Sequence, residues 1–455
     1  MGLAAALICV QSAARAEGLP DELQGLLGTH PQIQAKTASV ASAEDGIGIA
    51  RSGYLPTVKV DNSSGQQYDD SPIRTMMYGK PYMRGGDTSE ITVTQHVFDG
   101  YSTDSAVGAA KVNRDISQAD LRATRQNTLL DGATAYIAVV KATRLIQLAR
   151  DNVRKVEDEL NLEDERVEKG AGIAPDVLAA KQRLQVAKEM RVRFEGELET
   201  AAAKYIQVFG HAPDAANLAE PPIPTQALPA TLDEALAEAQ KNNPAIETAA
   251  KTVALTGQKR KSAEAGYYPT LDVVGHAGID DGYNAMPGVR RDWSVMAVAN
   301  WELFNGLKTR RQVAQASHDE IASKDNNLYS VRKVQELVRT SWSKLANARE
   351  RMGLLENAAI LAEDVWQSTK QRHAAGKATV RDMLDDESRI KEARIAYTQA
   401  YYEMVTATYE MLAAIGRMEA PVIADSANAG TETTGPLDGG MTKPADAQAP
   451  DTTVR

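Results

Sequence analysis

The sequence predicts a mainly helical protein with two pairs of β-strands, built from one unit that occurs twice. Three separated motifs repeat in the same order along the 455 residues. Residues 53–57 (GYLPT) return as 266–270 (GYYPT), and residues 98–100 (FDG) return as 304–306 (FNG). A third set also returns: Arg166, Gly170, Asp176, Leu178 and Arg183 correspond to Arg372, Gly376, Asp382, Leu384 and Arg389. Ordered matches of this kind indicate an internal duplication.

The spacing between the copies separates rigid segments from loops. The GYxPT motifs lie 213 residues apart, whereas the F-[DN]-G motifs and the third set lie 206 residues apart. The first copy therefore has seven more residues between its first two motifs and none after them. A segment of fixed length is expected of a rigid rod, and a variable one of a surface loop.

The N-terminus predicts a signal peptide at residues 1–16. Residues 3–10 are a short apolar run, and Ala14-Arg15-Ala16 provides a small-residue cleavage site. A buried N-terminal helix is the alternative interpretation. Cys9 is the single cysteine, so the mature chain would have no disulfide. No later run of about 18 uncharged apolar residues predicts a membrane-spanning helix.

Residues 17–210 form the first copy. Apolar residues follow a helical period over 20–52, which Pro31 interrupts. Strands are predicted at about 53–68 and 88–99, and the polar segment between them, rich in Asn, Ser, Gly and Asp, is typical of a loop.

A long helical hairpin completes the first copy. Residues 101–168 lack proline and repeat Leu, Ile, Val and Ala at helical spacing, which predicts a helix of roughly 100 Å. A tip turn at about 169–175 leads into a helix that ends near residue 209.

The second copy repeats this order after a linker. Residues 211–231 are the proline-bearing linker, and 232–416 are the second copy. Its strands are predicted at about 267–279 and 291–304, and its tip at about 374–380. Residues 417–455, rich in Ala, Gly, Thr, Pro and Asp, predict a disordered C-terminal tail.

Two short helices match one long helix in length. Residues 22–52 and 176–209 together hold 65 residues, against 68 in 101–168. Short helices stacked end to end can therefore lie beside the long one, which gives four helical columns per chain. A coiled-coil dimer is the alternative, but it does not explain why strand pairs interrupt both copies at the same place.

The strand at 291–304 gives the clearest membrane signal. Its alternate residues from Trp293 to Leu303 are apolar, and most residues of the other face are polar. Trp293 and Trp301 lie eight residues apart, about 27 Å along a strand, close to the height of the apolar band between two aromatic girdles. A soluble hairpin is the alternative.

Four strands per chain would not close a membrane barrel, since the smallest known barrels have about eight. Open strand edges in lipid would leave backbone groups without hydrogen bonds. If these strands span a bilayer, several chains must pool them. Three chains would supply twelve strands, although the sequence does not fix that number.

Composition argues against other functions. The net charge of −10 disfavours a nucleic-acid partner. The six histidines show no metal-ligand spacing, and no G-x-S-x-G, P-loop or H-E-x-x-H motif is present. We therefore predict no enzyme activity and no cofactor, and we interpret Asp385-Asp386-Glu387 as solvated charge rather than a metal site.

The duplicated, ordered set of motifs over about residues 20–416 resembles the TolC-type outer-membrane channel family. The resemblance implies a homotrimer in the outer membrane, with a twelve-stranded β-barrel in lipid and a periplasmic α-helical barrel. It also implies two partners, a periplasmic adaptor and an inner-membrane transporter that is either ABC-type or proton-driven. The segments at 211–231 and after 415 would form an equatorial region.

The resemblance also assigns roles at the hairpin tips. Asp382 and Asp385 match the family's D-x-L-D pattern and would ring the pore constriction, where a trimer would gather six carboxylates. The alternative is that these acidic residues are present only because the helix dipole favours negative charge in the first helical turn. The turns at Gly170, Gly172, Gly376 and Lys377 would face the adaptor.

A latch between the tips is a further implication of the resemblance. Asp176 matches the family's first-tip aspartate, whose partners are a tyrosine and an arginine. His373 and Ala378 occupy those partner positions here, so the usual latch is absent. Lys377 or Arg381 would have to replace the arginine, and a His373 pairing would make closure depend on pH.

We therefore expect an exit duct of a type I secretion system. The outer-membrane component of a multidrug efflux pump is the first alternative, and a soluble periplasmic coiled-coil adaptor is the second. The exported cargo stays open.

Overall fold

A computed structural model describes residues 18–72, 75–76, 79, 81–169, 174–215, 217–282 and 288–428. The chain divides into two compact units. Unit 1 takes residues up to 35, 122–244 and those from 332, and unit 2 takes 36–121 and 245–331. The predicted signal peptide lies outside the described residues.

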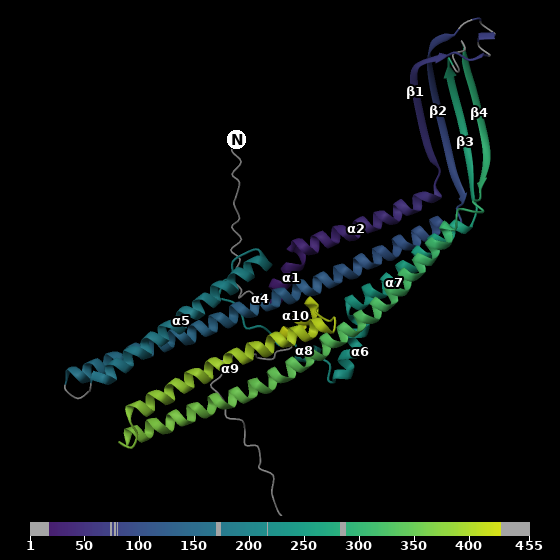
Figure 1. Ribbon diagram of the computed structural model, residues 1–455. Helices are drawn as coiled ribbons and strands as arrows, with labels where there is room; N and C mark the ends of the chain where they lie inside the picture. The colour runs from purple at the N-terminus through teal and green to yellow at the C-terminus, as the bar shows by residue number, and fades with distance from the viewer. Residues whose placement is uncertain are drawn as a thin grey trace, which may run out of the picture. The chain divides into compact units, whose positions relative to one another are not determined.

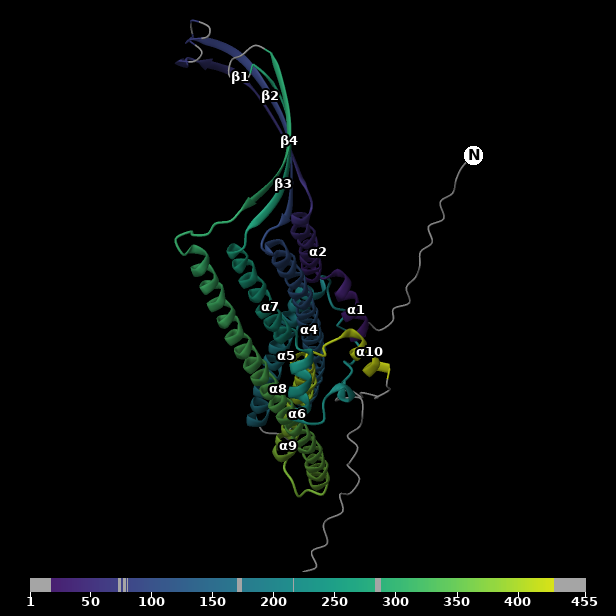
Figure 2. The same ribbon diagram turned by 90° about the vertical axis from the view of Figure 1, so that its right-hand side faces the viewer.

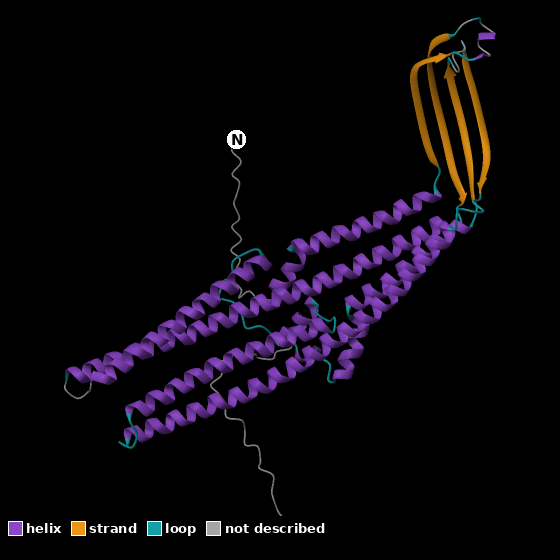
Figure 3. Ribbon diagram, in the orientation of Figure 1, coloured by secondary structure: helices purple, strands orange, loops and turns teal. Residues whose placement is uncertain are grey.

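The strands of unit 2 form one antiparallel sheet in the order β1-β2-β3-β4 (Figures 1 and 3). The bounds are β1 Thr57–Asp69, β2 Tyr82–Phe98, β3 Thr270–Asp281 and β4 Val289–Asn300. β2 begins six residues before the expected start at 88, because Gly85 and Gly86 pair with β1 without showing an alternating pattern. β4 ends at Asn300 rather than 304, because its partner there is Thr270, the first residue of β3.

The register gives the sheet one apolar and one polar face. Val60 pairs with Ile91, Ile91 with Ala277, and Ala277 with Trp293, so one apolar row crosses all four strands. The next row is Asp61, Glu90, Gly278 and Asp292. Alternation along each strand sends the two rows to opposite faces. Side chains of the apolar row are exposed on the surface of the single chain, with Trp293 80% exposed and Val60 68% exposed.

Short helices lead into β1 and β3. α2 (Pro31–Arg51) and the turn η1 (Ser52–Tyr54) precede β1, while α7 (Pro244–Glu264) and η3 (Ala265–Tyr267) precede β3. The helix expected over 20–52 is two helices, α1 (Leu19–Thr29) and α2, because Pro31 starts a new one. Pro244 separates α6 (Leu232–Asn242) from α7 in the same way.

Two helical hairpins follow the strand pairs. Hairpin 1 is α4 (Ser102–Glu168) with α5 (Ala174–Phe209), and hairpin 2 is α8 (Lys308–Ala374) with α9 (Val380–Ala414) (Figure 2). α4 and α8 each have 67 residues. In unit 1 the hairpins share a buried cluster in which Leu145 and Phe194 are fully buried and Ile395 of α9 packs against them.

The linker is fixed to the helices of unit 1 by tyrosines. The Tyr136 hydroxyl donates to the Ala219 carbonyl at 2.7 Å, and the Tyr409 hydroxyl donates to the Pro222 carbonyl at 2.6 Å. Glu220, between them, accepts from the Arg144 Nε atom at 2.9 Å. The linker thus has a fixed path although it contains few helical residues.

The C-terminal segment differs from the expectation of a disordered tail from residue 417. Ala420–Asn428 forms helix α10. Met418 and Ile423 are fully buried, and burial of these apolar side chains offsets the entropy lost on ordering. The expectation was therefore wrong for these residues, and positions 429–455 lie outside the described residues.

Candidate functional site

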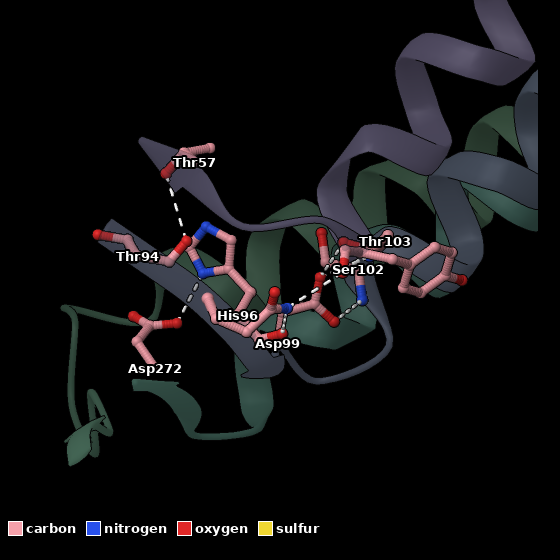
Figure 4. A network of polar contacts seen from close by, with 9 residues as sticks. Thr57, Thr94, His96, Asp99, Ser102, Thr103 and Asp272 are labelled. Carbon is pink, nitrogen blue, oxygen red and sulfur yellow. Dashed lines mark hydrogen bonds and ion pairs between the residues drawn. The ribbon is translucent and has the colours of Figure 1, made fainter. Parts of the chain in front are cut away.

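The F-[DN]-G motif caps the long helix where β2 ends. The Ser102 N–H donates to Asp99 Oδ1 at 3.0 Å, and the Thr103 N–H donates to Asp99 Oδ2 at 2.7 Å (Figure 4). These bonds satisfy helix N–H groups that have no partner within α4. Two residues before Phe98, His96 Nδ1 of β2 lies 2.6 Å from Asp272 Oδ1 of β3.

The GYxPT glycine packs against this cap in both copies. A Cβ atom on Gly53 would lie 2.9 Å from the Thr103 hydroxyl, and one on Gly266 would lie 3.1 Å from the Thr309 methyl. Thr309 is the equivalent of Thr103, and it accepts a hydrogen bond from Asn305 Nδ2 at 2.7 Å. Two motifs that are separate in sequence therefore form one strand–helix junction.

The junction also needs an unusual backbone. Gly100 and Tyr101 have φ of 67° and 68°, and Gly306 and Leu307 have φ of 66° and 67°. A Cβ atom on Gly100 would lie 2.6 Å from the Ala265 carbonyl oxygen. Glycine at this position is thus required both by the backbone and by close packing.

Equivalent side chains lock the strand ends. Gln95 Nε2 donates to the Tyr54 carbonyl at 3.1 Å, and Trp301 Nε1 donates to the Tyr267 carbonyl at 3.2 Å. Trp301 thus lies one residue beyond β4, at the junction, whereas Trp293 lies within the strand. Their role as a membrane girdle stays a prediction.

At the tip of hairpin 2, a glycine turn ends α8. The Lys377 N–H donates to the Arg372 carbonyl at 2.8 Å and the Gly376 N–H to the His373 carbonyl at 2.9 Å. Gly376 has φ of 71°. This Schellman turn satisfies the last carbonyls of α8 and reverses the chain.

Asp382 is held by the cap of α9. Its carboxylate accepts from the Thr379 N–H at 2.9 Å and from the Thr379 hydroxyl at 2.7 Å. These hydrogen bonds, and then the charges of Arg372 and Arg381, lower the pKa of Asp382. The exposed carboxylate is therefore ionised and kept in one orientation.

Asp385 joins the hairpins. Arg183 of α5 lies 3.0 Å from Asp385 Oδ1. One of the predicted constriction carboxylates is thus paired with a cation of hairpin 1, whereas Asp382 is capped within its own helix. Sequence reasoning did not indicate Arg183 as its partner.

The interpretation of Asp385-Asp386-Glu387 as solvated charge was wrong for Asp386. This side chain is 8% exposed and accepts a hydrogen bond from the Thr369 hydroxyl of α8 at 2.7 Å. It ties α9 to α8. No group of three or more potential metal ligands occurs among the described residues.

Sequence reasoning also missed a carboxyl pair between the hairpins. Glu159 of α4 and Glu387 of α9 hydrogen-bond to each other, and both are half-buried. Consecutive acidic residues such as 385–387 are typical of an exposed helix surface, so they do not indicate such a pair. Only the heptad-like position of Glu159, between apolar Val156 and Leu160, hinted at burial.

Several predicted tip residues remain untested. Gly170 and Gly172 lie outside the described residues, and so does the Asp176 side chain. The latch of Asp176 with His373 therefore stays a prediction. Within the described segments, no helix has the length and apolarity needed to cross a membrane.

The comparisons with known proteins agree on one family. The model of the family described as "Outer membrane efflux protein" matches residues 23–211 and 235–417. The outer membrane efflux protein BepC of Brucella suis is 26% identical over 418 residues, covering 90% of this chain and 87% of its own. The outer membrane protein TolC of Escherichia coli is 22% identical, covering 90% and 84%.

A secretion protein and a solved structure are also similar. The alkaline protease secretion protein AprF of Pseudomonas aeruginosa is 23% identical, covering 88% of this chain and 85% of its own. A crystal structure of a membrane protein from Pseudomonas aeruginosa has a TM-score of 0.76 at 17% identity, covering 88% of this chain and 90% of that one. The predicted duplicated, mainly helical fold is thereby confirmed.

Proposed function

Because the chain belongs to the outer membrane efflux protein family, we propose that three copies form an export channel, the exit duct of a type I secretion system. A periplasmic adaptor and an inner-membrane transporter would open this passive conduit. The family places the protein in the outer membrane and decides against the soluble adaptor.

The two-faced sheet is the observation that carries this proposal. It has four strands with open edges at β1 and β4, which would be unsatisfied in lipid. Its apolar face suits lipid and its polar face suits a water-filled lumen. Three chains would pool twelve strands and remove every edge.

The secretion role is supported by the similarity to AprF, whose name describes alkaline protease secretion. The similarity to BepC, which is named as an efflux protein, favours the alternative of a multidrug efflux component. Deleting the gene distinguishes the two. We expect loss of an exported protein, with restoration by the cloned gene; raised drug sensitivity with unchanged secretion would favour efflux instead.

We further propose that the tips form the gate. Asp382 and Asp385 would ring the constriction, while Asp176, His373 and Arg381 would govern closure. The turns at Gly170, Gly172, Gly376 and Lys377 would meet the adaptor. The pairing of Arg183 with Asp385 supports this assignment, because opening would separate the two hairpins and leave that carboxylate without its cation.

Conductance of the purified protein in planar bilayers tests the gate. Arg183→Ala should raise the closed-state conductance several-fold, because it removes an inter-hairpin ion pair. Arg150→Ala is the matched control, since Arg150 pairs with Glu195 inside hairpin 1 at 3.6 Å. Equal conductance in the wild type and both variants would contradict the gate, and absence of any conductance would contradict the channel.

A further inference from the structure

The carboxyl pair of Glu159 and Glu387 lies where hairpin 1 meets hairpin 2. Glu159 is nine residues before the end of α4, and Glu387 is seven residues after the start of α9. The pair thus lies about two turns from the tips. Two ionised carboxylates in such contact would repel each other, so a stable hydrogen bond between them needs a shared proton.

Charged groups of α4, α5 and α9 surround the pair. Glu159 is faced by Lys391 of α9 and by Arg183 of α5. Glu387 is faced by Lys155 of α4, and Lys391 lies 3.5 Å from its Oε1 atom. Arg183 is shared with Asp385, so its charge is only partly available to the pair.

The two carboxyls differ in their surroundings. Burial and the hydrogen bond to Glu387 raise the pKa of Glu159 from 4.5 to about 7. Burial would raise the pKa of Glu387 as well, but the hydrogen bond with Glu159 and the charges of Lys391 and Lys155 outweigh it and lower that pKa. The proton therefore resides on Glu159, which donates to the ionised Glu387.

Solvent reaches Glu387 through a groove, and Glu159 lies directly after Asp158, which also lines that groove. The groove has a volume of about 550 Å³ and is lined by side chains of α4, α8 and α9, including Lys155, Asp158, Glu363, Trp366, Glu387 and Lys391. Water in this groove can exchange the proton with the surrounding medium. The pair is therefore buried enough for its pKa values to shift and close enough to solvent to exchange its proton.

We propose that Glu159 and Glu387 form a proton-operated contact between the hairpins, which holds them together when a proton is shared and loosens when it is lost. Separation of the hairpins returns Glu159 to the pKa of a solvated carboxyl. The joined conformation thus binds more protons between pH 4.5 and about 7, so it is favoured as pH falls and disfavoured as pH rises through 7. This inference rests on the proposed function only for its consequence, which is gating.

Distance measurement by pulsed electron resonance tests the contact. Spin labels at Leu162→Cys of α4 and Glu392→Cys of α9 report the hairpin separation, in a Cys9→Ser background that removes the single native cysteine. Labelled protein is diluted into unlabelled protein, so that only pairs within one chain contribute. Between about pH 5.5 and pH 8 we expect the ratio of separated to joined conformers to rise on the order of 10-fold.

Glutamine variants separate this mechanism from other titrations. Glu159→Gln keeps a donor to Glu387 and should hold the joined conformation at every pH, whereas Glu387→Gln leaves Glu159 half-buried and should only weaken the pH response. The control Glu157→Gln alters a carboxylate whose partner Lys188 lies within hairpin 1 at 3.1 Å, and it should respond as wild type. A pH response that persists in Glu159→Gln overturns the proposal.

Conductance measured on the same proteins distinguishes a failure of the hairpin contact from a failure of the channel. A pH-dependent distance without any ion conductance would refute the channel but support the contact. Conductance with a pH-independent distance would refute the contact and leave the channel standing.

Discussion

Glu220 shows how a single side chain can hold a long linker in place. It accepts from Arg144 at 2.9 Å and from the Tyr402 hydroxyl at 3.0 Å. Burial first, and then the Glu220 charge, raise the pKa of Tyr402 above its ordinary value, so this hydroxyl remains a donor. The ion pair is largely shielded from solvent, with the Glu220 side chain 11% exposed.

Glu220→Ala should lower the free energy of unfolding by about 3 kcal/mol, because it removes one partner of a buried ion pair. Glu238→Ala is the matched control, since Glu238 pairs with Arg417 at 3.5 Å and is 34% exposed; its effect should stay below about 1 kcal/mol. Thermal unfolding followed by circular dichroism measures both. Equal effects would show that the linker is not held by Glu220.

The junction glycines provide a second residue-scale prediction. Gly100 and Gly306 share the same left-handed backbone, but a Cβ atom would meet the Ala265 carbonyl only at Gly100. Gly306→Ala should cost about 1 kcal/mol of backbone strain, and Gly100→Ala roughly 3 kcal/mol in all. Chemical unfolding of both variants decides this, and a similar cost at both positions would contradict the packing argument.

At the scale of elements, the start of α9 depends on one reciprocal cap. The Asp382 N–H donates to the Thr379 hydroxyl at 3.1 Å, and the Asp382 carboxylate accepts from Thr379 in return. Two unpaired N–H groups are satisfied together. The same carboxylate is proposed to face the pore, so the cap sets its direction as well as the helix start.

The cap should open in acid. The pKa of Asp382 is lowered from its ordinary value of 3.8, so its stabilisation is complete above that value and is lost as pH falls through the lower, folded pKa. Hydrogen exchange in the first turn of α9 should therefore accelerate several-fold in strong acid. Asp382→Asn should remove this pH dependence, and an unchanged profile in that variant would contradict it.

Sequence motifs and hydrophobic periodicity predict the helices and strands, whereas the side chains that pair between them can be identified only in the folded structure. The duplication, the hairpins and the alternation in β4 could be predicted because they are local patterns of spacing. The early start of β2 was missed because Gly85 and Gly86 have no side chains to alternate. The partners Arg183–Asp385 and Glu159–Glu387 were missed because each joins helices distant in sequence, and nothing local marks which faces meet.

At the scale of the whole molecule, the sheet is incomplete in one chain. β1 and β4 are its edges, since among the described residues each has a neighbouring strand on one side only, and such edges are open to pairing with another strand. The apolar row through Val60, Ile91, Ala277 and Trp293 would be exposed to water in a solitary chain. Pooling strands with other copies in a membrane resolves both problems at once, which is why assembly and insertion should depend on the same face.

Charge on either face of β4 tests this dependence. Val295 is 68% exposed on the apolar face and pairs with Gly275, while the adjacent Ser294 pairs with His276 on the polar face. Val295→Lys should cost about 2–4 kcal/mol of membrane stability and strongly reduce the folded protein recovered from the outer-membrane fraction. Ser294→Lys adds the same charge one residue away and should leave that recovery near wild type, because its side chain lies on the polar face that we propose to line the lumen. Equal loss in both variants would mean that neither face meets lipid as proposed.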